Sequence, residues 1–306
     1  MLNKIKIMQS VKSVFSIKDL ENLSGIKAHT IRIWEKRYNI LEPMRTETNI
    51  RFYDIYNLQK LLNITLLHNY GYKISTISKY PAEKIPILVR EIISEKSVKN
   101  HAINAFKMAM INFDQALFLS TYNNLLSEKS FREIFNDIFI PLLNEIGLLW
   151  QSDTIKPAHE HFISNLILQK LAINTEKVQI QQPLKKDKVF VLFLPMNEIH
   201  ELALMYINYE ISLNGYKSIY LGPNIPIENL KDVAQIFHNI VFVTYMTISP
   251  EKNEVENYIL SIKDEVLQES TSELWVMGRN IEHAYQKINL PKINMFSSLN
   301  ELIARL

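Results

Sequence analysis

The chain contains 306 residues, which is enough for about two domains. With 47% hydrophobic and 22% charged residues, and only 6 Gly and 11 Pro, its composition is that of a globular protein and excludes collagen-like and low-complexity chains. It contains no cysteine, which excludes disulfides, Cys-ligated zinc, iron–sulfur clusters and cysteine nucleophiles.

Charge is unevenly distributed along the chain. The formal net charge is +2, but residues 1–80 contain 13 Lys or Arg against six Asp or Glu, and the remainder is mildly acidic. A basic N-terminal module predicts a polyanionic partner for that module. Apolar runs such as 189–195 are far shorter than the roughly 20 residues that span a bilayer, and the first residues lack the pattern of a signal peptide. We therefore expect a cytoplasmic protein with no membrane partner.

Residues 14–80 are predicted to form short helices and one small β-wing. Ser16 can cap a first helix, Ser24-Gly25 ends it, and a second helix begins at Lys27. Two short helices joined by a Gly-containing turn match a helix-turn-helix, in which the second helix enters the major groove of DNA. The predicted elements are helices over 17–23, 27–38, 54–69 and 74–78, and a wing over 41–53.

Three segments together carry a resemblance to a known family: Thr30-Ile-Arg-Ile-Trp-Glu-Lys-Arg-Tyr38, Pro43-x-Arg-Thr46 and Arg51-x-Tyr53. They resemble the winged-helix domain of MerR-type transcriptional regulators. The resemblance implies a DNA-binding domain over residues 11–80. It also implies a dimer or tetramer on double-stranded promoter DNA, because such regulators bind near-palindromic sites. It assigns base edges to His29, Thr30 and Arg32, and phosphates or the wing to Arg37, Arg45, Arg51 and Tyr53.

Apolar residues recur at helical spacing in the middle of the chain, which predicts a four-helix bundle over residues 93–176. The preceding segment, 81–92, contains two prolines and is expected to be a linker with room for a short helix. Pro141 is expected to kink the third helix of the bundle, because proline lacks the backbone N–H. The predicted helices cover 98–110, 113–126, 130–150 and 156–174.

The fourth predicted helix opens with His159-Glu160-His161, which could suggest a metal site. Adjacent helical residues point about 100° apart, and the His-Glu-x-x-His spacing that puts two imidazoles on one face is absent, so we expect no metal ion in the bundle. Trp150, followed after nine residues by Glu160-His161, resembles the helical cap of cobalamin-binding regulators in the MerR class. That resemblance places these three side chains over the upper corrin face, where the adenosyl group lies. Gln151 stands where light-sensing members have a His that ligates cobalt after photolysis.

After a polar connector over 177–187, predicted strands alternate with predicted helices. This alternation predicts a flavodoxin-like, doubly wound parallel sheet over residues 188–306, with ligands bound beyond the carboxyl ends of its strands. The predicted strands cover 188–195, 217–222, 240–244, 273–278 and 293–296, and the predicted helices cover 198–214, 227–237, 250–269, 281–287 and 298–305.

The loop after the first of these strands contains neither a Gly-x-Gly-x-x-Gly nor a phosphate-binding loop. Glu198-Ile-His200-Glu-Leu-Ala203 instead resembles the Glu/Asp-x-His-x-x-Gly motif of cobalamin-binding domains, in which the His ligates cobalt from the lower face. Three positions depart from the family: Ala203 replaces a Gly, Thr244 replaces a Ser, and Gly278 stands alone where the family has a Gly pair. The residues that the resemblance assigns to the cofactor are Trp150, Glu160, His161, Glu198, His200, Ala203, Thr244 and Gly278, with His200 as the cobalt ligand.

We interpret the chain as a multidomain α and α/β protein with a winged helix-turn-helix, a four-helix bundle and a flavodoxin-like sheet. The first hypothesis is a non-enzymatic transcriptional regulator, a repressor, that senses adenosylcobalamin; light is a second candidate signal, which Gln151 disfavours. A second is a cofactor-independent MerR-type repressor controlled by a protein antagonist, which the altered positions around the cofactor tail favour. A third, a corrinoid-carrier subunit, is opposed by the DNA-binding head and by the absence of a substrate-binding barrel.

Overall fold

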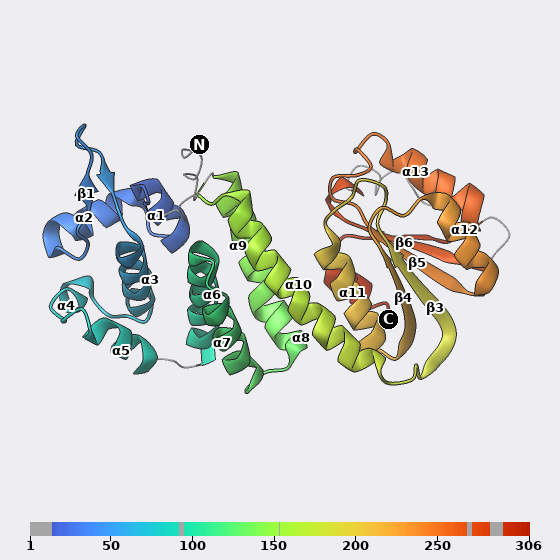
Figure 1. The fold of residues 1–306 in the computed structure, drawn as a ribbon, viewed down its shortest axis with the longest axis horizontal. Helices are drawn as coiled ribbons and strands as arrows, with labels where there is room; N and C mark the ends of the chain where they lie inside the picture. The colour runs from blue at the N-terminus through green and yellow to red at the C-terminus, as the bar shows by residue number, and fades with distance from the viewer. Residues whose placement is uncertain (1–13, 92–94, 153, 268–270, 282–289) are drawn as a thin grey trace, which may run out of the picture. The chain divides into compact units, whose positions relative to one another are not determined.

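The computed structural model describes residues 14–91, 95–152, 154–267, 271–281 and 290–306 (Figure 1). The chain divides into two compact units, residues 1–167 and 168–306. The first unit contains the winged helix and most of the helical bundle, which sequence reasoning treats as separate domains. The second contains the parallel sheet.

The N-terminal part of the first unit has the predicted winged helix-turn-helix. Ser16 caps α1 in a capping box with Asp19, and Gly25 ends the helix in the left-handed conformation, with φ of 76°. Asp54 caps α3 by accepting a hydrogen bond from the N–H of Asn57. The elements are α1 (Ile17–Ser24), α2 (Ala28–Tyr38), β1 (Met44–Arg45), β2 (Arg51–Phe52), α3 (Ile55–Asn69) and α4 (Ile74–Ile77), with β1 and β2 antiparallel.

The linker predicted over 81–92 is largely helical. Helix α5 (Lys84–Glu91) packs against α3 and buries Ile85 and Val89. Pro86 lies in the first turn of α5, where its missing N–H breaks no helical hydrogen bond. The DNA-binding domain therefore extends beyond the predicted boundary at residue 80, because an amphipathic helix needs the α3 surface to bury its apolar face.

The bundle contains the four predicted helical segments, and a cluster of buried phenylalanines forms much of its interior. The third segment contains a π-helical turn, Phe135–Phe139, immediately before Pro141. Since Pro141 has no N–H to donate to the preceding turn, the wider turn accommodates it without ending the segment. The helices are α6 (Glu95–Asn112), α7 (Gln115–Leu126), α8 (Phe131–Ile134), α9 (Ile140–Gln151) and α10 (Pro157–Gln179).

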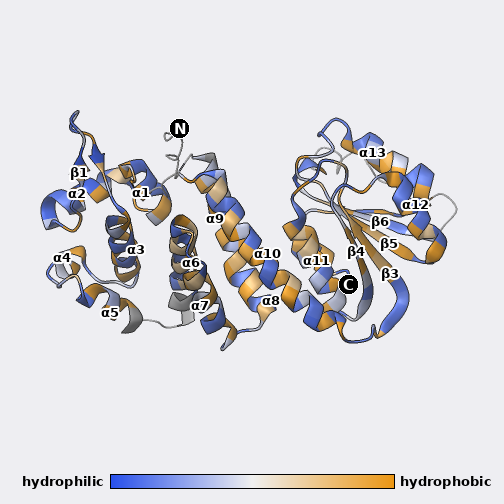
Figure 2. Ribbon diagram, in the orientation of Figure 1, coloured by the Kyte–Doolittle hydropathy of each residue, from blue (hydrophilic) through white to orange (hydrophobic). Residues whose placement is uncertain are grey.

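The second unit contains a five-stranded, fully parallel sheet with strand order β4-β3-β5-β6-β7, which confirms the flavodoxin-like, doubly wound prediction. Its strands are β3 (Lys185–Phe193), β4 (Tyr216–Gly222), β5 (Ile240–Tyr245), β6 (Glu273–Met277) and β7 (Ile293–Phe296). Helices α11 (Glu201–Leu213) and α15 (Leu299–Ile303) cover one apolar face, and α12 (Ile227–Ile236) and α13 (Val255–Ile262) cover the other. The inner strands are predominantly hydrophobic (Figure 2).

Some predicted boundaries are wrong by several residues. The connector predicted over 177–187 shortens to 180–184, because α10 continues to Gln179 and Lys185 already donates its backbone N–H to the Gly215 carbonyl. The helix predicted over 250–269 begins later, at Val255, and ends in a π-helical turn. The helix predicted over 281–287 lies mostly outside the described residues. Within the described parts of the chain, every helix is too short or too polar to cross a bilayer.

Candidate functional site

The loop after β3 lies at the point where the order of the strands in the sheet reverses. Strand β3 has β4 on one side and β5 on the other, so the connections that leave β3 and β5 diverge. In open α/β sheets this divergence creates the crevice in which ligands bind. The segment Pro195–His200 occupies the carboxyl end of β3 and leads directly into α11.

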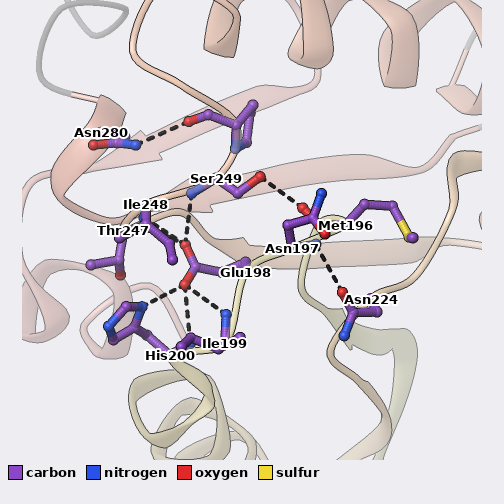
Figure 3. A network of polar contacts seen from close by, with 11 residues as sticks. Met196, Asn197, Glu198, Ile199, His200, Asn224, Thr247, Ile248, Ser249 and Asn280 are labelled. Carbon is purple, nitrogen blue, oxygen red and sulfur yellow. Dashed lines mark hydrogen bonds and ion pairs between the residues drawn. The ribbon is translucent and has the colours of Figure 1, made fainter. Parts of the chain in front are cut away.

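Glu198 connects this loop to the loop that follows β5. Its side chain is completely buried, and one carboxylate oxygen, Oε2, accepts backbone hydrogen bonds from Thr247, Ile248 and Ser249 at 2.7, 2.7 and 3.1 Å. The other oxygen, Oε1, accepts backbone hydrogen bonds from Ile199 and His200, both at 3.0 Å (Figure 3). The carboxylate is therefore the centre on which two loops converge.

These hydrogen bonds determine the ionisation of Glu198. Burial by itself raises the pKa of the carboxyl group, but hydrogen bonds from the Ile248 and His200 amides, the His200 ring and the Ser249 amide outweigh it and lower the pKa to about 2. The group is consequently an anion at neutral pH. An ionised carboxylate can act only as a hydrogen-bond acceptor, which matches the donors around it.

His200 is oriented by the same carboxylate. Its Nδ1 lies 2.7 Å from Glu198 Oε1, and its side chain is 48% exposed. Because the Glu198 carboxylate can only accept a hydrogen bond, Nδ1 of His200 carries the proton and donates the bond. In the neutral imidazole, Nε2 then presents a lone pair. An imidazole held by a carboxylate in this way is a typical metal ligand with its outer partner already in place.

Apolar side chains accompany this imidazole on the two loops. Met196 and Ile199 on the loop after β3, and Ile248 on the loop after β5, are all exposed (Figure 3). Solvent-exposed apolar side chains around a polar ligand group are characteristic of a binding surface. The arrangement suits a broad, largely apolar ligand that carries a metal ion.

The remaining predicted residues of this unit lie at the same end of the sheet. Ala203 is half-buried in the first turn of α11. The buried Thr244 hydroxyl, at the end of β5, has no hydrogen-bond partner among the described residues. Gly278 follows β6 with φ of +130°, and a Cβ there would overlap the backbone of Met246. The residues thus fit a histidine-ligated corrinoid with a free hydroxyl beside it, but the Met246 main chain fills the space next to Gly278.

The predicted cap residues belong to the first unit. Trp150 lies near the end of α9 with 53% of its surface exposed, which an ordinary core tryptophan would not have. Glu160 and the exposed His161 are adjacent in the first turns of α10, with His161 Nδ1 3.7 Å from Glu160 Oε2. His159 is buried, and its Nδ1 accepts a hydrogen bond from the Lys156 backbone. Among the described residues, no cluster of three potential metal-binding side chains occurs.

Helix α2 presents three of the seven predicted DNA-contacting residues to solvent. His29, Arg32 and Arg37 are exposed, whereas Ile31 and Trp34 are buried on the opposite face. Thr30 is half-buried. In the wing, the exposed Arg45 donates a hydrogen bond to Asn49 at 2.6 Å, a contact that orders the wing turn. Cationic groups on a helix and on an adjacent wing are the arrangement expected for a DNA-binding face.

Glu35, which sequence reasoning missed, connects the wing to α2. It accepts hydrogen bonds from Arg51 Nε at 2.9 Å and from the Tyr53 hydroxyl at 3.0 Å. Tyr53 is completely buried, and burial followed by the contact with Glu35 raises the pKa of its hydroxyl. An acidic residue in a basic recognition helix is a signal that could have indicated an internal partner. The Tyr53 hydroxyl therefore links the residue that follows β2 to α2.

Replacing Tyr53 with Phe is expected to lower the free energy of unfolding by about 1–2 kcal/mol, because a partly buried carboxylate loses a hydrogen-bond donor. Thermal unfolding of the full chain would measure the effect. Tyr56→Phe is the matched control, since Tyr56 is 76% exposed and should be unaffected. Equal stability of the two variants would contradict a structural role for the Tyr53 hydroxyl.

Comparisons with known proteins agree with these two sites. Residues 15–84 match the family described as MerR HTH family regulatory protein, and residues 102–174 match the B12 binding domain. The HTH-type transcriptional repressor CarH of Myxococcus xanthus is 25% identical over 223 residues, covering 71% of this chain and 73% of the relative. The HTH-type transcriptional repressor CarA of the same organism is 22% identical over 233 residues, covering 75% of this chain and 76% of the relative.

A solved structure shows the same fold for about two thirds of the chain. The monomethylamine corrinoid protein of Methanosarcina barkeri matches with a TM-score of 0.58 at 12% identity, over 69% of this chain and 97% of its own. The order of the matched parts, a MerR-type head followed by a B12-type bundle and a doubly wound sheet, is the order predicted from the sequence. The chain is thus similar to MerR-type transcriptional regulators in which a DNA-binding domain is joined to a B12-binding domain.

Proposed function

We propose that the chain is a transcriptional repressor that binds adenosylcobalamin through its sensor and changes its affinity for promoter DNA in response. The observation that carries this proposal is the His200 imidazole, whose Nδ1 is held 2.7 Å from the buried Glu198 carboxylate at the switch point of the sheet. The naming of both relatives as repressors supports the direction of regulation.

Each predicted cofactor residue has a distinct task in this proposal. When bound, the corrinoid would supply a cobalt ion, and the His200 imidazole would hold that ion. Glu198 fixes the ring of His200 and keeps its tautomer. Thr244 and Gly278 would bind the tail of the cofactor, and Ala203 stands where close approach needs a small residue. The predicted cap residues Trp150, Glu160 and His161 complete the proposed set.

The N-terminal domain would bind a near-palindromic site as a dimer or tetramer. We assign base contacts to His29, Thr30 and Arg32, because these are the side chains at the start of the recognition helix α2. Arg37, Arg45 and Arg51, with Tyr53 behind them, would hold phosphates or the wing. Guanidinium groups suit phosphate binding because they are planar and can donate two parallel N–H hydrogen bonds to the oxygens of one phosphate.

Arg32→Ala and Arg51→Ala are expected to affect DNA binding differently. Loss of a base contact at Arg32 should cost about 1–3 kcal/mol on the preferred site and relax preference at one or two base pairs. Arg51→Ala removes the ion pair with Glu35 that holds the wing as well as the proposed phosphate contact. It should therefore weaken binding to all sequences and reduce the slope of log affinity against log salt concentration by about 1. Affinities for the preferred site and for single-base variants, measured at several salt concentrations, would check both. Equal loss on every sequence would contradict base reading by Arg32.

The test of the proposed function is the visible spectrum of the purified chain. After incubation with adenosylcobalamin in darkness and removal of free cofactor, about one cofactor per chain should remain, and promoter affinity should differ from that of the cofactor-free chain. Green light applied to the loaded protein tests the light response separately. A colourless protein would contradict cofactor binding.

A second function is favoured by one observation. The Met246 main chain fills the space beside Gly278, and Tyr245 packs against the sheet core next to it, where the family accommodates the cofactor tail. A repressor that has lost the cofactor and responds to a protein antagonist would have such a filled tail site. It would repress equally with and without adenosylcobalamin.

A further inference from the structure

Polar side chains bridge the DNA-binding domain and the bundle within the first unit. The bridge involves α1, which packs against the recognition helix α2, and α9, which ends near Trp150. Two separate contacts connect α1 to this region. One runs through Lys107 of α6 to Glu145 of α9, and the other runs to Thr154, three residues beyond the end of α9. Neither belongs to the predicted DNA interface or to the predicted cofactor residues.

The first contact is made by Lys107 of α6. Its side chain is only 7% exposed, and its ammonium forms an ion pair with Glu145 of α9. The same group donates a hydrogen bond to the Leu23 carbonyl in the last turn of α1 at 3.4 Å. Carbonyl groups at a helix end lack partners within the helix and favour a nearby cation. A lysine that is almost completely buried thus connects α9 to the end of α1.

The second contact is made by Asn22, also in the last turn of α1. Its side-chain amide donates a hydrogen bond to Thr154 Oγ1 at 2.8 Å. Thr154 is completely buried, lies 3.0 Å from Ser152 Oγ, and donates its backbone N–H to the Leu149 carbonyl of α9. The segment that holds Asn22 is therefore anchored on the end of α9, within four residues of Trp150.

The seam between the two parts is polar and partly open. A cavity of about 350 Å³ lies beside Lys107 and is lined in part by Asn69, Asn100 and Asn104. Interfaces between domains that move resemble transient interfaces, which are more polar than a permanent core. The same cavity is also lined by the buried Leu62, Leu66 and Ile103, so the seam combines amide groups with an apolar contact between α3 and α6.

We propose that Lys107, Glu145, Asn22 and Thr154 form a latch that fixes the DNA-binding domain on α9, so that displacement of α9 at Trp150 changes the position of α2. The identity of the trigger at Trp150 rests on the proposed function, but the latch itself does not. Two hydrogen bonds at the end of α1, together with the ion pair between Lys107 and Glu145, hold the domain in one orientation when α9 is in place. When α9 moves, both contacts change together, because both are anchored on it.

The latch is tested by the distance between two labels, one on each side of the seam. The chain contains no cysteine, so Lys79→Cys and Glu128→Cys, both at exposed positions, allow specific spin labelling. The cofactor-free chain should give a narrow distance distribution. Lys107→Met and Asn22→Ala should each broaden or shift it, whereas Lys99→Met, an exposed lysine on the same helix, should not. A broad distribution in the parent chain, or unchanged distances in both latch variants, would overturn the latch.

Lys107→Met is a suitable variant because Glu145 is 43% exposed and stays hydrated when its partner is removed. The methionine also retains most of the apolar stem of the lysine. An unchanged melting temperature would confirm that the variant is folded. Asn22→Ala provides an independent variant that leaves the buried charge in place.

Coupling is tested by the ratio of promoter affinities with and without adenosylcobalamin. Breaking the latch should reduce this ratio at least about fivefold, the lower end of typical coupling between sites, with cobalamin uptake unchanged. A wild-type ratio in both latch variants would overturn the coupling role. If the parent chain itself does not respond to cobalamin, the proposed function fails, while the label distances still decide whether the latch exists.

Discussion

His200→Ala is expected to lower the affinity for cobalamin by more than about 100-fold, because loss of an outer partner of a metal ligand alone typically costs 10–100-fold. Exposed on the loop after β3, the ring can be removed without creating a buried cavity, so the fold should persist. The absorption spectrum of any cofactor still bound should also lose the features of histidine ligation. Titration in darkness, followed by absorption, measures both changes.

The matched control is His238→Ala. His238 is also exposed, but it lies in the loop that precedes β5, at the opposite end of the sheet from His200. Its removal should leave cobalamin affinity and spectrum unchanged. If His200→Ala retained the affinity and spectrum of the parent chain, His200 would not be the cobalt ligand, and the proposed geometry of the site would be wrong.

Glu198→Gln is expected to destabilise the second unit by about 3 kcal/mol at neutral pH. The carboxyl pKa is about 2 in the folded chain against an ordinary value of 4.5, and each pKa unit corresponds to about 1.4 kcal/mol. Because folding lowers this pKa, the stabilisation is fully present above pH 4.5 and is lost as the pH falls toward 2. A glutamine also directs an amide donor at backbone N–H groups that need an acceptor.

Urea unfolding of the second unit at pH 7, 4 and 2.5 would measure this effect. The difference between the parent chain and Glu198→Gln should be largest at pH 7 and should shrink at each step downward. Glu251→Gln, at an exposed position near the same loop, is the control and should have little effect. A difference independent of pH would show that the charge of Glu198 contributes nothing to stability.

Sequence patterns predicted the architecture well because the periodicities are strong. Buried strands alternate with amphipathic helices after residue 185, and Asp54 and Ser16 are clear helix caps, so these elements lie within a few residues of their predicted positions. Helix α5 was assigned to a linker because two prolines suggested a break, whereas Pro86 lies in a first turn that tolerates it. Local patterns do not reveal the α3 surface on which α5 packs.

The candidate site was predicted only in part for a different reason. The resemblance of residues 198–203 to a cobalamin-binding motif singled out His200 and Glu198, and the structure places their side chains in direct contact. Glu35 was missed because its function depends on Arg51 and Tyr53, which become neighbours only when the wing folds back on α2. Contacts between segments far apart in sequence leave no local signal.

The support of Glu198 by three consecutive backbone N–H groups has a consequence for how such regulators diverge. Residues 247–249 hold the carboxylate through atoms that every amino acid except proline possesses. Selection for this contact therefore acts on the path of the chain and leaves the choice of side chain open, most of all at the exposed Ile248. Relatives can have a different side chain at position 248, suited to their own ligands, while the backbone still holds the carboxylate of Glu198.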